Sequence, residues 1–209
     1  HVFDPAAGNY RLAEGKADES VVDILKNKIP AERFAQLHES NHPQAQFLWS
    51  IFRDSFHYCA VHLAHIANNA RDLDFAIRWG FGWERGPFEI WQAAGWQKVA
   101  GWIAADIAAG RAMSATPLPA WVLEAGRSGV HGPEGSFAPV ANAYQPRSVL
   151  PVYKRQPFPD RLFGEAVKYG ETIFETGGVR CWHTGDDIAI VSFKSRMHAI
   201  GDDVLDGVL

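Results

Sequence analysis

The chain has 209 residues, of which 47% are hydrophobic and 21% are charged, and its formal net charge is -4 at pH 7. This composition is typical of a globular protein, and the acidic balance with dispersed Lys and Arg disfavours nucleic acid as a partner. Cys59 and Cys181 cannot form a disulfide framework, no run of about 18 apolar residues predicts a membrane span, and no leader is recognisable, so we expect a cytoplasmic protein.

The N-terminal segment, residues 1–39, predicts turns followed by two short helices. Asp4-Pro5 and Gly8-Asn9 favour turns, and apolar periodicity is absent around them. From residue 20 to residue 38 the pattern is helical, and Pro30 divides it because proline fits the first turn of a helix but not its interior. We therefore expect one short helix before Pro30 and one that starts there.

Residues 40–126 predict a helical domain organised around one long helix. Asn41 is its expected cap, Pro43 suits its first turn, and Asn68-Asn69 mark its end. Its buried side is expected at positions spaced by three and four, namely Leu48, Phe52, Ser55, Cys59, His62 and Ile66.

Four shorter helices are expected to complete this domain. Proline favours the start of a helix and glycine its end, which sets most of the boundaries. The helices are one capped by Asp72 and ending at Gly80, one from Pro87 to Gly95, one from Trp96 to Gly110, and one from Pro119 to Gly126.

The composition changes after Gly126. Residues 127–170 are rich in proline, glycine and aromatic side chains, which predicts an ordered linker over the helical domain rather than a helix. Residues 171–209 predict a small β-meander and then a helix start near 201–203; the β-prone runs are Thr172-Ile173-Phe174, 179–182 and 188–193. The fold class is therefore mainly α, with a Pro-rich linker and a small β-meander after the helical domain.

Both ends of the sequence favour a fragment of a longer protein. The first residue is His1 rather than methionine, and the segment 204–209 stops inside an amphipathic pattern without a cap.

Possible metal and phosphate sites each have a structural interpretation that we favour. His57, Cys59, His62 and His65 can suggest a metal, but no further ligand completes a site at the required spacing. The pairs Asp186-Asp187 and Asp202-Asp203 can hold Mg²⁺, but a hairpin turn explains the first pair and a helix start explains the second. The cations Lys154-Arg155 and those from Lys194 to Arg196 can contact phosphates or remain solvated.

Gly80 to Gly86 has loose dinucleotide-fingerprint spacing, but it lies between helices and follows no strand.

The segment from Asp72 to Trp91 has an acidic start, a Gly-x-Gly corner and Gly-Pro-Phe-Glu at the opening of a helix. It resembles the C-terminal helical domain of 3-hydroxyacyl-CoA dehydrogenases. The residues that carry this structural signature are Asp72, Asp74, Gly80, Gly82, Gly86, Pro87, Phe88 and Glu89. The resemblance implies a domain that packs on an NAD-binding Rossmann domain, helps to close the acyl-CoA cleft and often forms a homodimer.

Residues 178–193, together with Met197 to Ile200, are similar to the first hairpin of enoyl-CoA hydratases and isomerases, the crotonases. This second resemblance implies that Lys194, His198 and Ala199 lie near bound CoA. Together the two resemblances imply a multifunctional β-oxidation enzyme in which the hydratase domain follows the dehydrogenase.

The chain departs from the dehydrogenase pattern at the substrate contact. Catalytic copies carry an Asn-Arg pair in the long helix, whereas this chain has Phe52-Arg53 there, which implies a second, noncatalytic repeat without catalytic or cofactor-binding residues. The segment His1 to Pro5 is superficially similar to the element that carries the catalytic histidine of the family, but it follows no Rossmann half and is interpreted as the connection between repeats.

Several hypotheses about function follow from these patterns. In the first, a parent enzyme oxidises (3S)-3-hydroxyacyl-CoA to 3-oxoacyl-CoA with NAD and also has enoyl-CoA hydratase activity, while this fragment is structural or dimerising and inactive alone. In the second, the chain is a noncatalytic helical interaction module whose tryptophan-rich helices support a neighbouring domain or a partner. A free-standing helical metalloprotein is a third hypothesis.

Overall fold

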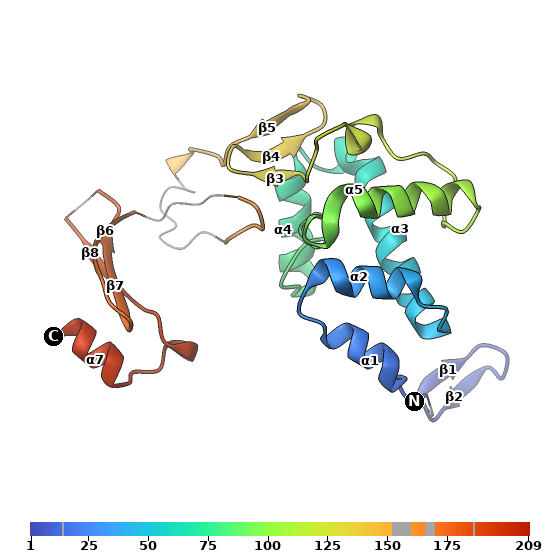
Figure 1. Ribbon diagram of the computed structural model, residues 1–209, viewed down its shortest axis with the longest axis horizontal. Helices are drawn as coiled ribbons and strands as arrows, with labels where there is room; N and C mark the ends of the chain where they lie inside the picture. Colours follow the sequence, from blue (N-terminus) through green and yellow to red (C-terminus); the bar gives the residue numbers. More distant parts are fainter. Residues whose placement is uncertain (14, 152–159, 166–169, 186) are drawn as a thin grey trace. The chain divides into compact units, whose positions relative to one another are not determined.

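The computed structural model describes residues 1–13, 15–151, 160–165, 170–185 and 187–209. It contains two compact units (Figure 1). Unit 1 comprises His1–Gln145 and Leu162–Gly164, and unit 2 comprises Pro146–Arg161 and Glu165–Leu209. No helix among the described residues has the length and apolar character needed to cross a membrane.

Unit 1 opens with a hairpin that the sequence did not predict. Of the predicted turn residues, Pro5 and Gly8 lie between two short antiparallel strands, and Asp4 and Asn9 pair at the strand ends. The Asp4 carboxylate accepts hydrogen bonds from the amides of Ala6 and Ala7 at the turn. The two short helices that follow are confirmed, with Pro30 in the first turn of the second. The elements are β1 (Val2–Asp4), β2 (Asn9–Arg11), α1 (Glu19–Lys26) and α2 (Pro30–Glu39).

The central helix α3 (Pro43–Ile66) starts at the predicted proline, but its cap and buried side differ from the prediction. His42, not Asn41, is the cap, because its Nδ1 accepts the amide N–H of Gln44 at 3.3 Å. The predicted Ile66 is exposed at the last residue of the helix. Its buried apolar residues are Ala45, Trp49, Phe56, Cys59, Ala60 and Leu63, while Leu48 and Phe52 are half-buried.

The next helix is α4 (Ala70–Phe81), and the prediction that Asp72 caps it was wrong. Asn69 is the cap, since its side chain accepts the amide N–H of Asp72, which lies in the first turn. The helix ends one residue beyond the predicted Gly80, where Gly82 takes a left-handed conformation with φ of 69°. Glycine suits this position because other L-residues adopt it at a cost.

Helix α5 (Pro87–Ala108) begins at the predicted proline but joins two segments that were expected to be separate helices. Gly95 interrupts the helical backbone with φ of 100° and ψ of 93°, so the predicted break is present as a kink. The indole of Trp91 donates to the carbonyl of Trp96 across this kink at 3.0 Å, and the two rings stack at 4.2 Å in the core.

The end of unit 1 contains less helix and more strand than the sequence predicted. Only a short 3-10 turn lies in the range of the expected fourth helix, and a small antiparallel sheet lies in the range of the expected linker. Phe137 of this sheet is buried against the helical core. The elements are η1 (Ala120–Leu123), β3 (His131–Gly132), β4 (Gly135–Ala138) and β5 (Ala143–Gln145).

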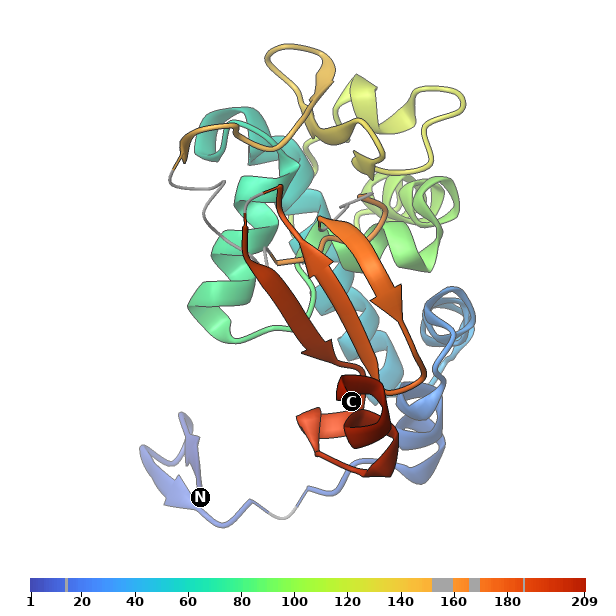
Figure 2. The same cartoon turned by 90° about the vertical axis from the view of Figure 1, so that its left-hand side faces the viewer.

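Unit 2 contains the predicted β-meander, in which three antiparallel strands follow one another in the sheet (Figure 2). The predicted helix start after Gly201 is also confirmed. Gly207 of that helix packs closely on the sheet, where an added Cβ would lie 2.6 Å from Val179. The elements are β6 (Glu171–Glu175), β7 (Val179–His183), β8 (Ala189–Phe193), η2 (Arg196–His198) and α7 (Asp202–Val208). With its long helices and small sheets, the chain is compatible with a mainly α fold.

Candidate functional site

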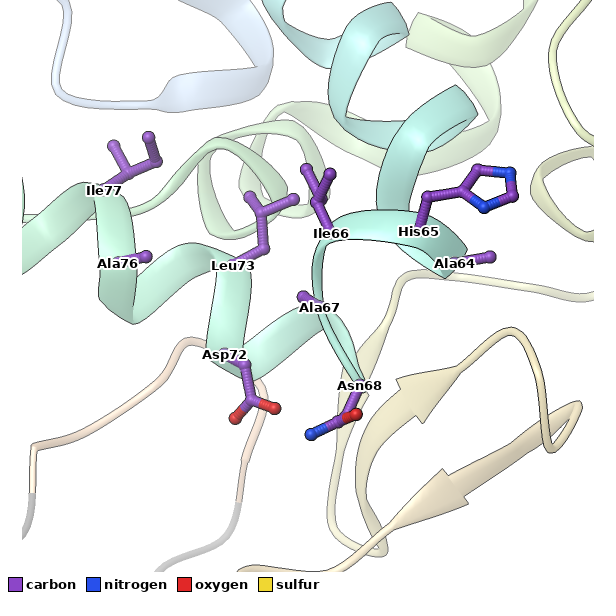
Figure 3. A pocket seen from close by; sticks show the side chains of 9 residues that line it. All are labelled: Ala64, His65, Ile66, Ala67, Asn68, Asp72, Leu73, Ala76 and Ile77. Atoms are coloured by element: carbon purple, nitrogen blue, oxygen red, sulfur yellow. The ribbon is translucent and has the colours of Figure 1, made fainter.

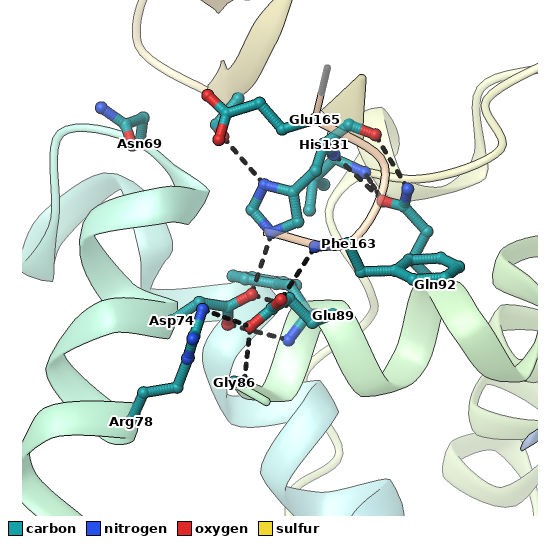
Figure 4. Close-up of polar contacts among 12 residues, drawn as sticks. Asn69, Asp74, Arg78, Gly86, Glu89, Gln92, His131, Phe163 and Glu165 are labelled. Atoms are coloured by element: carbon teal, nitrogen blue, oxygen red, sulfur yellow. Dashed lines mark hydrogen bonds and ion pairs between the residues drawn. The ribbon is translucent and has the colours of Figure 1, made fainter. Parts of the chain in front are cut away.

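Asp74 is the centre of a buried polar corner between α4 and α5 (Figure 4). Its carboxylate, which is 0% exposed, accepts the backbone N–H groups of Phe88 at 3.0 Å and Glu89 at 2.9 Å. Gly86 is the N-cap residue of α5 and has no side chain that could satisfy these donors. Asp74 therefore caps α5 from the neighbouring helix, where its charge also suits the helix dipole.

Close packing requires a glycine at position 86. Its φ of -76° is open to any residue, but an added Cβ would lie 2.5 Å from the Cα of Asp74 and would overlap the Asp74 side chain. The capping carboxylate thus occupies the volume that a larger residue at position 86 would need.

Glu89 completes the start of α5. Its buried carboxylate accepts the N–H of Gly86 at 2.9 Å and the N–H of Phe163 at 2.8 Å, and Arg78 approaches it at 3.5 Å. The first of these bonds is the part of a capping box in which the Glu side chain at position N3 accepts the backbone N–H of the N-cap residue. The second ties a segment far along the chain to the same corner, so Glu89 links three parts of unit 1.

His131 joins the corner from the small sheet and was missed by the sequence analysis. Its Nε2 lies 2.9 Å from the Asp74 carboxylate and its Nδ1 lies 2.8 Å from the Ser136 hydroxyl. Gln92 holds the same strand, accepting the N–H of His131 at 3.0 Å and donating to its carbonyl at 2.8 Å. No local pattern marks His131, because its partner lies 57 residues earlier in the chain. Asp74, Glu89 and His131, with Arg78 and Gln92, are called the Asp74 corner below.

The order Ser136, His131, Asp74 is that of a hydrolase triad, yet the corner does not expose a nucleophile. All three residues are buried, and the side chains of His131 and Asp74 are 0% exposed. A catalytic serine must reach a substrate carbonyl. The arrangement therefore satisfies buried polar groups and holds the small sheet on the helices.

Phe52 lies among aromatic rings of the core. It packs edge-on against Phe34, with ring centroids 4.9 Å apart, and its ring centroid is 5.9 Å from that of Phe56. The adjacent Arg53 is buried in an ion-pair network with Asp54 at 2.9 Å and Asp106 at 3.2 Å. Both members of the Phe52-Arg53 pair are thus engaged within unit 1.

Asp106 is the centre of that second network. Burial acts to raise the pKa of its carboxyl, but hydrogen bonds from Trp49, Arg111 and Arg53 outweigh burial and lower the pKa below 3.8. The carboxylate therefore stays charged and links α3, α5 and the segment after α5.

The histidines and the cysteine of α3 are not brought together as a site. His57 lies 2.7 Å from the carbonyl of Thr116, and His65 is exposed at the end of the helix. Burial, with a contribution from Asp74, raises the pKa of the Cys59 thiol to about 12. Across the described residues no group of three or more His, Cys, Asp or Glu side chains could hold a metal ion.

A surface pocket of about 500 Å³ lies between the end of α3 and the start of α4 (Figure 3). Ile66, Leu73 and Ile77 project to one side of the backbone, and Asn68 and Asp72 to the other. Asp72 and Asp74 therefore differ: the first is exposed beside the pocket and the second is buried in the corner. The pocket is lined by Ala64, His65, Ile66, Ala67, Asn68, Asp72, Leu73, Ala76 and Ile77.

The residues of unit 2 that were predicted to lie near CoA are exposed. Lys194 donates to the carbonyl of Thr176 at 2.9 Å and pairs with Glu175 at 3.0 Å, while His198 and Ala199 lie at the turn after β8. The predicted carboxylates Asp202 and Asp203 lie in the first turn of α7. Lys154, Arg155 and Asp186 lie outside the described residues.

Over 164 residues, which are 77% of this chain, the sequence is 29% identical to a "Probable 3-hydroxyacyl-CoA dehydrogenase" of Bacillus subtilis (strain 168). The matched segment is 19% of that protein, so the chain spans about a fifth of the length of the curated relative that it matches. No protein-family profile and no solved structure matches the chain. The similarity supports the dehydrogenase resemblance seen in the signature residues.

Proposed function

We propose that this chain is a noncatalytic helical part of a larger 3-hydroxyacyl-CoA dehydrogenase of β-oxidation. The parent enzyme would oxidise (3S)-3-hydroxyacyl-CoA to 3-oxoacyl-CoA with NAD. In this proposal residues 40–126 are the second C-terminal-like helical repeat and residues 1–39 connect it to the first. Residues 127–170 then lead into an enoyl-CoA hydratase/isomerase domain that starts at 171–209. The similarity to the Bacillus subtilis protein supports the dehydrogenase part.

The environment of Phe52 is the observation that carries the noncatalytic assignment. The resemblance places a substrate-facing asparagine at this position in catalytic copies, and a phenyl ring has no group that can donate to a thioester oxygen. Phe52 instead packs with Phe34 and Phe56, and Arg53 is held by Asp54 and Asp106. This part of α3 therefore contributes packing rather than chemistry.

NAD does not fit the described residues as a cofactor of this chain. The described strands pair antiparallel, whereas a dinucleotide site needs a parallel βαβ unit with a glycine-rich turn. The Gly80 to Gly86 segment joins α4 to α5, and the Asp74 side chain occupies the space beside Gly86. In the proposal the nucleotide and the catalytic base belong to other domains of the parent, and the Asp74 corner fixes the angle between two scaffold helices.

An activity and binding experiment on the chain itself tests the noncatalytic assignment. With NAD and a (3S)-3-hydroxyacyl-CoA, the purified chain should form no NADH, and titration with the thioester should leave tryptophan fluorescence without a saturable change. NADH formation above a protein-free control would overturn the assignment. Light scattering on the same sample decides whether the helical domain forms a homodimer.

The parent enzyme tests the dehydrogenase proposal. The full-length protein should form NADH from the same thioester, and Phe52→Leu should leave its kcat/KM within about twofold, because Phe52 contacts core rings and leucine keeps the position apolar. Hydration of an enoyl-CoA by the full-length protein tests the hydratase assignment of residues 171–209.

If the folded parent lacks dehydrogenase activity, the alternative of a helical interaction module is favoured, since exposed apolar side chains such as Phe47 and Tyr58 on α3 suit a protein contact.

A further inference from the structure

His38 introduces a titratable ring into the aromatic interface between α2 and the rest of unit 1. Its imidazole stacks on the indole of Trp102, with ring centroids 4.3 Å apart and planes 9° apart. The same imidazole meets Trp49 edge-on at 5.2 Å and 88°. His38, Trp49 and Trp102 therefore form one cluster that connects α2 to α3 and α5, called the His38 cluster below.

The Asp106 carboxylate, which acts on His38 electrostatically, is occupied by other donors. Asp106 accepts the indole N–H of Trp49 at 2.9 Å and hydrogen bonds from Arg53 at 3.2 Å and Arg111 at 3.0 Å. Within the described part of the chain, the imidazole of His38 makes ring contacts and no hydrogen bond. A protonated His38 would thus carry a half-buried charge without a hydrogen-bonded counterion.

Charged groups of three segments face His38. Burial is the main influence and lowers the pKa of His38 below 6.5, and Lys98 of α5 and Arg111 after α5 act in the same direction. Asp106 of α5 and Glu39 of α2 oppose them without reversing the result. The unfolded or undocked segment therefore binds a proton at a higher pH than the docked one, so docking is most stable above pH 6.5 and weakens as the pH falls below it.

We propose that His38 makes the docking of α2 on α3 and α5 pH-sensitive, so that protonation of its ring loosens α2 in mildly acid solution. Loosening would remove Phe34 and Leu37 of α2 from the core and uncover Phe52 and Phe56 of α3. This inference concerns the fold of unit 1 and goes beyond the proposed function, on which it does not depend.

Amide hydrogen exchange on the unmodified chain tests the proposal between about pH 8 and about pH 5, the range in which histidine titrates. After correction for intrinsic exchange rates, protection of residues 30–39 should fall as the pH is lowered, because the undocked segment binds the proton more tightly than the docked one. Protection of residues 96–108 should change less. Equal losses in both segments, or no loss in residues 30–39, would overturn the proposal.

Two variants and one direct titration separate His38 from other groups. His38→Phe retains a stacking ring that cannot be protonated, so the acid-dependent loss should disappear, whereas His65→Phe at an exposed position should behave as the unmodified chain. Persistence of the loss in His38→Phe contradicts the proposal. If that variant does not fold, NMR titration of the unmodified chain decides, because a His38 pKa at or above 6.5 overturns the proposal and a lower one supports it.

Discussion

At the scale of single residues, glycine stands at the signature positions 80, 82 and 86 for different physical reasons. Gly82 ends α4 with a positive φ, whereas Gly86 has an ordinary φ and lies against the Asp74 side chain. Gly80 lies inside α4 with nothing within 4 Å of an added Cβ. Gly82 is therefore needed for its backbone conformation and Gly86 for space, whereas position 80 could accept a side chain.

Substitution of Gly86 and Gly80 tests this distinction. Gly86→Ala should lower the free energy of unfolding by about 2–4 kcal/mol, because the new methyl group displaces the capping carboxylate of Asp74. Gly80→Ala should raise it by about 0.5–1 kcal/mol, because alanine is favoured over glycine at an open position inside a helix. Urea unfolding followed by tryptophan fluorescence measures both, and equal effects of the two substitutions would contradict the steric explanation.

His131 is the second residue-scale prediction. His131→Ala removes one hydrogen-bond partner of the buried Asp74 carboxylate and leaves the Ser136 hydroxyl unpaired. The expected loss of stability is about 2–4 kcal/mol, the range for breaking a buried charged network. His65→Ala, at an exposed position, is the control and should change stability by less than about 0.5 kcal/mol. A loss below about 1 kcal/mol for His131→Ala would show that the two amide bonds suffice to hold Asp74.

At the scale of elements, α5 depends on the backbone freedom of Gly95. Its φ of 100° turns the helix so that Trp91 and Trp96 stack and the Trp91 indole finds a carbonyl. The sequence predicted a helix end at this glycine, and the structure has a kink within one element. Burial of both tryptophans explains why the chain turns back into helix after the interruption.

Alanine substitutions at the kink and in the regular helix after it test the role of Gly95. Gly95→Ala should destabilise unit 1 by about 1–3 kcal/mol, because alanine is strained at a positive φ of this kind. Gly101→Ala, in the regular second half of α5 with open space around it, should stabilise by about 0.5–1 kcal/mol. The thermal midpoints of the two variants should therefore move in opposite directions, and a stabilised Gly95→Ala would contradict the assignment.

At the scale of the whole molecule, unit 1 is discontinuous in sequence. Leu162 is buried in it, and the N–H of Phe163 donates to Glu89 in the Asp74 corner. The short segment Leu162–Gly164 therefore completes the core of a unit whose main part ends at Gln145. A boundary chosen from composition alone, such as the one after Gly126, leaves these contacts out.

Two truncated chains test this completion. A chain of residues 1–164 should unfold at a urea concentration close to that of the tryptophan-monitored transition in the intact protein. A chain of residues 1–145 should be less stable than residues 1–164 by about 2–4 kcal/mol, because it loses the burial of Leu162 and one donor to Glu89. Equal stability of the two truncated chains would contradict a structural role for residues 162–164.

The sequence by itself determined the local features of this protein. Proline and glycine predicted the starts of α2, α3 and α5 and the interruption at Gly95, and the β-prone runs predicted the meander of unit 2. These features depend on residues a few positions apart, whose backbone preferences act in any context. The signature from Asp72 to Trp91, a contiguous stretch, also predicted a resemblance to 3-hydroxyacyl-CoA dehydrogenases, which the similarity to the Bacillus subtilis protein supports.

Only the tertiary structure decided what the signature residues do. Asp74 is held by His131, 57 residues away, and Glu89 by Phe163, 74 residues away, so no local pattern could distinguish the buried Asp74 from the exposed Asp72. The buried side of α3 also depended on which helices cover it. Burial and hydrogen-bond partners are properties of segments that meet only after the chain folds, and they turn a sequence motif into a capped, space-filling corner.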